Sequence, residues 1–312
     1  MGVRMGDDPP GLGLLVTWDH ALASGLTIGQ INHRVRSGRW TSLRRGVYLR
    51  EEARASAVDR FARAREDHVL ASIAASLRWQ ASIVGLTSAA TVLDLPLTSG
   101  VPQEVQLLVP RHGWAGTRAG VRALRSDVPT DHMTWLPQWS AGVTSVARTW
   151  VDIARTESLA DALSVGDHCL REGLVSVDEL REAVDRLGET RGVRRALEAL
   201  VHLDGRRETP LESLSWARFL EWGIPLPEIQ REFYDASGFI GRVDFFWPEL
   251  GIVGEADGRL KYDREMALWK EKRREDRLRS QGLGMVRWGW GDMASPSSPF
   301  RFVLAAALAR AA

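Results

Sequence analysis

The sequence has little cysteine and no long apolar run, and each absence excludes a class of protein. Cys169 is the single cysteine among 312 residues, which excludes an internal disulfide and any metal site built from a cysteine cluster. No apolar run reaches the roughly 20 residues that a transmembrane helix needs. The first twenty residues include Asp7, Asp8, Pro9 and Pro10 and lack the layout of a signal peptide. These absences predict a cytoplasmic protein with no membrane partner.

Carboxylates are missing from one stretch of the chain, although the whole protein is nearly neutral, with a formal net charge of +1. Between His20 and Arg50 there are six arginines and no aspartate or glutamate. Between Arg259 and Arg287 there are ten basic residues and five acidic ones. Two basic regions in a neutral chain predict two surfaces for a polyanion. An arginine-rich composition is the alternative, but it does not account for the missing acids near residue 40.

The stretch from Thr17 to Arg50 has the order of a winged helix-turn-helix: two helices followed by a basic hairpin. Thr17 is placed to cap a short helix that ends at Gly25, and Thr27 opens a second helix with Gln30 in a capping box. The hairpin is expected at 40–49, turning at residues 44–46.

The second helix and the hairpin contain the residues expected to contact DNA. Ile28, Ile31 and Val35 share one face of the helix, so the basic side chains are free to point outward. In a winged helix the second helix enters the major groove and the hairpin holds phosphate. The candidate ligands of nucleic acid here are Gln30, His33, Arg34, Arg36, Arg44 and Arg45. The alternative is a small helical cap with a solvated arginine face.

The middle of the chain, residues 56–205, reads as a mixed and mostly helical region. Its patterns predict helices over 57–79, 146–154, 159–171 and 177–187, and strands over 105–109 and 121–124. His168 and Cys169 fall in a predicted helix and are expected to be packing residues, because no third group that would orient a catalytic pair is visible.

A new unit is predicted to begin near residue 206. Thr209 caps a helix in which Pro210 takes the first position and Glu212 the third, and the helix ends before Gly223. Three strands are expected at 228–234, 239–247 and 251–257. They are joined by turns at 235–238 and 248–251.

Acidic residues are predicted to meet on one face of this sheet. If the turn at 248–251 is a four-residue loop, Trp247 pairs with Ile252, which puts Asp244 opposite Glu255 and Arg242 opposite Asp257. Opposed carboxylates repel by about 0.2–1 kcal/mol, and a divalent cation would offset that. Mg²⁺ takes one or two carboxylates together with substrate phosphate. The alternative is a surface salt-bridge network in which Arg242 neutralises the acids.

A basic helix over 263–281 and a strand over 285–290 follow the acids. Metal-holding acids beside basic groups that hold phosphate are what phosphodiester hydrolysis requires. The candidate phosphate ligands are Lys261, Lys270 and Arg274, and the alternative is a solvated basic face.

At these residues the chain resembles a known family. The blocks are Gly241-Arg-Val-Asp-Phe-Phe-Trp-Pro-Glu, Glu255-Ala-Asp-Gly, Arg273-Arg-Glu-Asp-Arg-Leu and Gly284-Met-Val-Arg-Trp, over about residues 208–292. They resemble an actinobacterial domain of unknown function that is related to the very-short-patch-repair endonucleases of the PD-(D/E)xK nuclease superfamily. The resemblance implies a restriction-endonuclease-like α/β fold that uses Mg²⁺ or Mn²⁺. By resemblance, Asp244 and Glu255 match the two metal-binding acids, and Glu212 matches the acid on the first helix.

The chain departs from the superfamily at one position. Where the pattern usually has lysine two residues after the second acid, this chain has Asp257. Asp257 is therefore assigned as a third metal ligand or as a base that orients water, and Lys261, Lys270 or Arg274 as the source of the missing positive charge.

The front of the chain resembles a second family. The blocks Gly25-Leu-Thr-Ile-Gly-Gln-Ile, Arg34-Val-Arg-Ser-Gly and Arg44-Arg-Gly-Val-Tyr are similar to the winged-helix domain of AbiEi-type antitoxins, which are transcriptional regulators. The stretch Val143-Thr-Ser-Val-Ala-Arg-Thr-Trp-Val-Asp looks like the domain that follows it in that family.

These patterns predict an α+β multidomain protein. Its expected parts are a winged helix-turn-helix at 14–55, a mixed middle domain at 56–205 and a nuclease-like domain at 206–312. The first functional hypothesis is a metal-dependent DNA endonuclease. The second is a non-catalytic, antitoxin-like regulator that retains a nuclease fold, with a toxin protein as a further partner. The pattern leaves the oligomeric state and the target sequence open.

Overall fold

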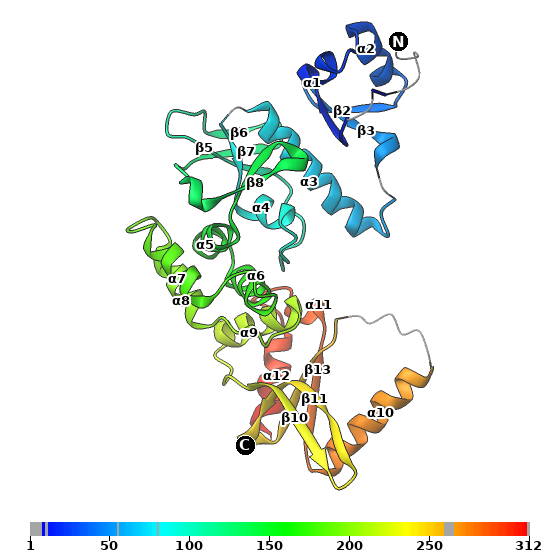
Figure 1. Ribbon diagram of the computed structural model, residues 1–312. Coiled ribbons are helices and arrows are strands. Elements are labelled where there is room, and N and C mark those ends of the chain that lie inside the picture. Colours follow the sequence, from blue (N-terminus) through cyan, green and yellow to red (C-terminus); the bar gives the residue numbers. More distant parts are fainter. Residues whose placement is uncertain (1–7, 10–11, 55, 80, 259–264, 311–312) are drawn as a thin grey trace. The chain divides into compact units, whose positions relative to one another are not determined.

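The computed structural model describes residues 8–9, 12–54, 56–79, 81–258 and 265–310, with 265–271 described by their backbone only (Figure 1). In this part of the chain the architecture is mixed α and β, with three sheets. The chain divides into two compact units, Met1–Ile153 and Ala154–Ala312. The predicted divisions at 55/56 and 205/206 fall inside these units.

The first unit begins with a three-stranded sheet in the order β1-β3-β2. Thr27 forms the expected capping box with Gln30, whose Oε1 accepts the Thr27 N–H at 2.8 Å. Ile31 and Trp40 are buried in a shared core, whereas Ile28 is exposed, so the inward face of α2 is narrower than predicted. The elements are β1 (Leu15–Thr17), α1 (Trp18–Ala23), α2 (Ile28–Arg36), β2 (Trp40–Arg44) and β3 (Val47–Arg50).

A six-stranded sheet in the order β6-β7-β5-β4-β9-β8 follows in the same unit. The predicted strands at 105–109 and 121–124 are its β5 and β7, which pair in parallel. The strands β4, β6, β8 and β9 have only two to four residues and are too short to show a period, so the sequence pattern did not predict them. The elements are α3 (Arg60–Arg78), β4 (Ile83–Val84), α4 (Leu86–Val92), β5 (Val105–Val109), β6 (Gly116–Arg118), β7 (Val121–Arg125), β8 (Met133–Leu136), β9 (Ala141–Thr144) and α5 (Val146–Thr156).

Helices open the second unit and lead directly to its sheet. Ala160 and Leu163 of α6 share one apolar core with Leu211 and Leu214 of α9. Because this core spans the predicted boundary at 205/206, the helices before residue 206 belong to the same compact unit. These elements are α6 (Leu159–Arg171), α7 (Val177–Asp185), α8 (Val193–Val201) and α9 (Pro210–Trp222).

The second unit ends in a four-stranded sheet in the order β10-β11-β12-β13. Trp247 pairs with Ile252, as the four-residue turn predicts, and β12 runs parallel to β13. One apolar cluster joins the sheet to α9 and α12, and another joins it to Leu278 of α10, so helices cover both faces (Figure 1). The elements are β10 (Glu228–Asp235), β11 (Gly238–Trp247), β12 (Ile252–Ala256), α10 (Glu265–Ser280), β13 (Gly284–Trp288), α11 (Trp290–Met293) and α12 (Phe300–Ala309).

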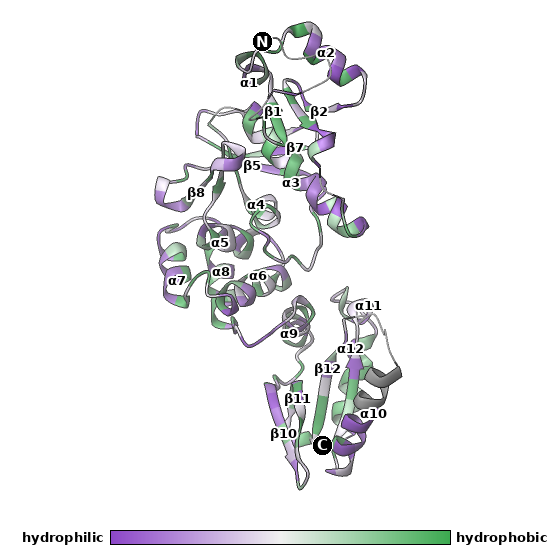
Figure 2. Cartoon of the chain, turned by 45° about the vertical axis from the view of Figure 1, so that its right-hand side comes forward, coloured by the Kyte–Doolittle hydropathy of each residue, from purple (hydrophilic) through white to green (hydrophobic). Residues whose placement is uncertain are grey.

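Hydropathy differs sharply between α10 and the strands that it covers. Figure 2 shows the described part of α10 as hydrophilic, whereas β12 is largely apolar. No described helix is long and apolar enough to cross a membrane.

Candidate functional site

The first turn of α9 positions one of the predicted acids. Glu212 is buried, and its carboxylate accepts hydrogen bonds from the N–H of Glu208 at 3.0 Å and from the hydroxyl of Thr209 at 2.8 Å. Gln230 of β10 donates a third hydrogen bond to Glu212 at 2.8 Å. Gln230 has a positive φ of 56°, a left-handed conformation that sequence periodicity does not reveal. Glu212 is thus tied to the sheet as well as to its own helix.

Asp244 lies on β11 beside the carboxyl end of β12. Its Oδ2 accepts the N–H of Ala256 at 2.8 Å. Phe245 pairs with Gly254, so the same register continued by one residue brings Asp244 next to Glu255, as predicted. Gly254 lets Trp288 pack directly against the strand, because a Cβ at this position would lie 2.5 Å from the ring of Trp288.

Glu255 is buried and held by an arginine of α10. Arg274 donates from Nη2 to Oε1 at 2.7 Å and from Nη1 to Oε2 at 3.3 Å. The same Nη2 also donates to the carbonyl of Arg242 at 2.8 Å. Gly241 makes room for this arrangement, because a Cβ at that position would lie 2.5 Å from Nε of Arg274. Of the three cations proposed for this role, Arg274 is the one whose side chain the structure describes, and it contacts an acid of the site.

The electrostatics of Asp244 follow from these neighbours. Burial raises the pKa of Asp244 to about 7, and the carboxylates of Glu212 and Glu255 push it in the same direction. The N–H of Ala256 and the charge of Arg274 act in the opposite direction. A carboxyl that ionises with such difficulty beside two other acids is a group that a cation would stabilise.

Asp257 does not converge on this cluster. Its side chain is 43% exposed, and its Oδ2 lies 3.9 Å from Nη1 of Arg287. Arg242 pairs with Glu208 and not with Asp257, so the predicted opposition of Arg242 and Asp257 is wrong. The reason is that β12 ends at Ala256 and the N–H of Asp257 bonds to the carbonyl of Trp288 on β13. Arg242 therefore cannot be the residue that neutralises the acids.

Two of the predicted phosphate ligands lie outside the described part of the structure. They are Lys261 and the side chain of Lys270.

The expected Mg²⁺ or Mn²⁺ would need oxygen ligands from the acids of this site. No group of three or more aspartate, glutamate, histidine or cysteine side chains is placed to share an ion among the described residues. Asp244 and Glu255 remain as two adjacent carboxylates, and a set of one or two carboxylates suits Mg²⁺ when substrate phosphate and water complete the shell. The residues fit a two-carboxylate site of this kind and not the three-acid site that included Asp257.

At the front of the chain the arginines divide into two groups. Arg34 has no exposed surface; its Nε donates to Oδ1 of Asp8 at 2.7 Å, and its guanidinium lies 5.8 Å from the ring of Trp40. Arg50 bonds to the other oxygen of Asp8 at 2.6 Å, and Arg39 pairs with Glu52 at 2.5 Å.

Acids outside the acid-free stretch thus neutralise half of its arginines. Arg34 is a structural residue in this arrangement. The prediction that it faces nucleic acid is wrong, because its guanidinium is buried and paired with Asp8.

Arg36, Arg44 and Arg45 form the second group. No carboxylate partner for them occurs in the described part of the chain. Arg36 donates from Nε to the carbonyl of Asn32 at 3.3 Å, and Arg44 donates to the carbonyl of Ala119 at 2.6 Å. His33 and Arg45 are exposed. These residues are the uncompensated basic surface of α2 and the β2–β3 hairpin.

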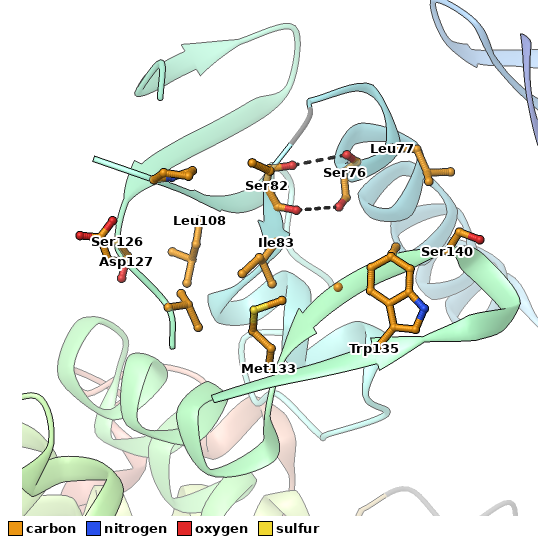
Figure 3. A pocket seen from close by; sticks show the side chains of 15 residues that line it. Ser76, Leu77, Ser82, Ile83, Leu108, Ser126, Asp127, Met133, Trp135 and Ser140 are labelled. Carbon is orange, nitrogen blue, oxygen red and sulfur yellow. Dashed lines mark hydrogen bonds between the residues drawn. The ribbon is translucent and has the colours of Figure 1, made fainter. Parts of the chain in front are cut away.

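A cavity of about 490 Å³ lies in the first unit, away from all of these residues (Figure 3). Ile83, Leu108 and Met133 line it, and the hydroxyls of Ser76 and Ser82 bond across to each other's carbonyl groups. Its lining includes no histidine, cysteine or lysine. Asp127 also lines the cavity, and its carboxylate is paired with Arg111 at 2.6 Å. The lining therefore offers one acid that already has a partner and no base to work with it.

No protein-family profile matches the chain. The uncharacterized proteins MT2308 and Rv2248, from two strains of Mycobacterium tuberculosis, are each 26% identical over 265 residues, which is 84% of this chain and 89% of theirs. A solved structure, that of the RV2827C protein from Mycobacterium tuberculosis, has a TM-score of 0.41 and 14% identity, and covers 71% of this chain and 84% of that one. The names of these proteins state no activity.

Proposed function

We propose that the protein is a DNA endonuclease that requires Mg²⁺ or Mn²⁺ and hydrolyses phosphodiester bonds at the sheet of its second unit. The observation that carries this proposal is the meeting of Asp244 and Glu255, with Glu212 nearby and Arg274 joined to Glu255. Adjacent acids, one of which has a raised pKa, suit a site for a cation and a phosphate when an arginine of a basic helix lies beside them. This unit is proposed to be a restriction-endonuclease-like domain.

Each residue has a separate task in this proposal. Asp244 and Glu255 would hold the cation, and a bound divalent ion would supply charge to polarise the phosphoryl group and to lower the pKa of a water. Glu212 holds the end of α9 and adds negative charge beside Asp244. Arg274 moves from Glu255 to the scissile phosphate, where a guanidinium binds two oxygens at once.

The first unit delivers the enzyme to DNA. Its helices α1 and α2 and its β2–β3 hairpin are proposed to act as a winged helix-turn-helix that uses Gln30, His33, Arg36, Arg44 and Arg45. Only the last three carry charge without an acidic partner in the described residues, so they are expected to supply the phosphate contacts.

One observation favours a second candidate, an antitoxin-like regulator that binds DNA without cutting it. Arg274 neutralises Glu255 in the way that a cation would, and such a pair keeps the fold intact without metal. In that case the protein would keep its metal site without catalysing a reaction. A toxin protein would be a further partner.

The test is direct cleavage. The purified full chain is incubated with single- and double-stranded DNA and RNA, with Mn²⁺ or with a chelator, beside the Asp244→Asn variant. Cleavage of DNA that needs Mn²⁺ and is lost in the variant supports the enzyme. Intact nucleic acid in every arm, together with tight binding to one DNA sequence, would establish the regulator instead.

A further inference from the structure

The strongest unassigned feature of the molecule is a polar pocket of about 1010 Å³ in the first unit. It is bordered by the start of α1, by the turn between β2 and β3, and by the end of α3, which packs against both of these strands. Its volume lies at the upper end of the range for small-molecule sites. Arg45 is the one residue of its lining that has been given a role above, so the rest of the lining is unassigned.

A buried polar group of this lining has no partner. Tyr48 is only 8% exposed, and its hydroxyl makes no hydrogen bond to any described residue. Burying a hydroxyl without a partner is unfavourable, and a bound molecule that bonds to it would remove that penalty. The indole N–H groups of Trp18 and Trp79 likewise meet no acceptor in the described part of the chain. The pocket therefore presents three such donors to whatever binds it.

Two guanidiniums of the lining are also without an acidic partner. Arg45, on the turn, and Arg78, the last residue of α3, are exposed, and neither pairs with a described carboxylate. Asp19 is the one acid of the lining, so two positive charges face one negative charge. A phosphate group carries a charge of about −1.5 to −2 and three acceptor oxygens, and a guanidinium binds two of these oxygens at once. This excess of donors and positive charge favours a phosphate.

The rings beside the cations indicate what the phosphate is attached to. Trp18 is the first residue of α1, and Trp79 follows α3; both are partly buried and line the same pocket. Aromatic side chains in a basic groove bind nucleotides by stacking on the base, while the cations hold the phosphate. A ligand with both parts would use the rings, the guanidiniums and the Tyr48 hydroxyl together.

We propose that this pocket binds a nucleoside 5′-phosphate, either as a free nucleotide or as the phosphorylated end of a DNA strand. The site lies in the first unit and needs no cleavage at Asp244 and Glu255, so it goes beyond the proposed function.

The first test measures binding to the full chain by calorimetry, in chelator so that no strand is cut. The probes are AMP and UMP, one purine and one pyrimidine nucleotide. Ribose 5-phosphate lacks the base and should bind about 5- to 100-fold more weakly than AMP. Adenosine lacks the phosphate and should bind about 10- to 150-fold more weakly. A short single strand with and without a 5′-phosphate distinguishes the two sources, because the tighter of AMP and the phosphorylated strand identifies the ligand.

Three variants separate the pocket from general attraction to positive charge. Arg78→Gln should weaken binding of the nucleotide about 10- to 150-fold. Arg36→Gln is the matched control, because Arg36 is another exposed arginine without a described acidic partner and does not line the pocket. Tyr48→Phe should weaken binding about 2- to 12-fold. It should not lower the melting temperature of the free protein, since its hydroxyl has no described partner to lose.

Three results would overturn the site. The first is a parent that binds neither nucleotide nor the phosphorylated strand. The second is an equal loss in Arg36→Gln and Arg78→Gln, which would show that charge alone acts. The third is an Arg78→Gln variant that loses as much affinity for a blunt, unphosphorylated duplex as for AMP, since the pocket would then be part of a duplex-binding surface.

The outcomes for this site and for the nuclease can be told apart. A protein that binds AMP through Arg78 but cuts no DNA keeps the site without the nuclease. A protein that cuts DNA with Mn²⁺ but binds no nucleoside 5′-phosphate keeps the nuclease without the site.

Discussion

Both carboxylate oxygens of Glu255 accept hydrogen bonds from the single guanidinium of Arg274, at 2.7 and 3.3 Å. The arginine therefore uses one lone pair on each oxygen that a metal ion would need. A cation bound to Glu255 would lie beside the positive charge of Arg274, so the two positive charges compete for one acid. This competition gives the proposed site measurable properties.

Replacing Arg274 should change stability and metal binding in opposite directions. In chelator, Arg274→Ala should lose about 1–3 kcal/mol of unfolding free energy, because Glu255 is left buried without its charged partner. On addition of Mn²⁺ the variant should gain more stability than the parent, since a ligand that binds the native state stabilises it and its competitor is gone. Thermal melts across a Mn²⁺ titration measure both effects. Lys272→Ala, an exposed cation on the same helix, is the control, and equal Mn²⁺ gains in all three proteins would contradict the competition.

Gly241→Ala should act through the same guanidinium. The new Cβ would lie 2.5 Å from Nε of Arg274, so the arginine must move away from Glu255. In a double-mutant cycle, the loss of unfolding free energy in the double variant Gly241→Ala, Arg274→Ala should then be smaller than the sum of the two single losses, by about 0.5–3 kcal/mol. Gly291→Ala is the matched control, because its Cβ would meet nothing within 4 Å. Full additivity would mean that the glycine and the arginine act independently.

The pKa of Asp244 predicts a pH dependence of stability. Its native pKa of about 7 lies above the value of 3.8 for an unperturbed aspartate. At a pH between these two values, the carboxyl is protonated in the native state and ionised in the unfolded state. Ionisation of this group therefore destabilises the protein as the pH rises from about 4 to about 7, by at most about 1.4 kcal/mol per pH unit. Asp244→Asn keeps the acceptor for Ala256 but removes the charge, so its advantage over the parent should grow across this window.

Denaturant unfolding in chelator between pH 4.5 and pH 8 measures this difference. The advantage should be absent near pH 4 and level off above pH 7. Stability curves of parent and variant that stay parallel would show that Asp244 ionises normally.

DNA binding by the first unit should depend on the arginines that lack an acidic partner. Changing Arg44 and Arg45 to alanine should flatten the log–log salt dependence of duplex binding by about 1 to 2 units, at about 0.9 for each lost phosphate contact. Arg39→Ala should leave the slope unchanged, because Arg39 is paired with Glu52. Fluorescence anisotropy with a blunt duplex over a range of salt concentrations measures the slopes. An unchanged slope in the double variant would remove the hairpin from the interface.

The elements with strong local signals could be predicted from the sequence. The capping box of Thr27 and Gln30 follows from the chemistry of helix caps. The pairing of Trp247 with Ile252 follows from the length of the turn between them. Both effects act over a few residues. The meeting of Asp244 and Glu255 follows from the same register.

Long-range partners could not be predicted in this way. Arg34 reaches Asp8, 26 residues earlier, and Arg242 reaches Glu208 on another element. Asp257 was misassigned because alternation was continued past the end of β12 at Ala256. A charge pattern shows which residues are ionised but not which of them meet after folding.

The position of Asp8 determines how the N-terminal part of the first unit can be isolated. This one carboxylate receives Arg34, Arg50 and the indole N–H of Trp40, and it precedes the first strand, β1. A fragment cut at Leu12 would keep the described helices and strands of the unit but would remove the carboxylate that the buried Arg34 shares with Arg50 and Trp40. Such a fragment should be less stable than one that begins before Asp8, so fragments of this unit should retain that residue.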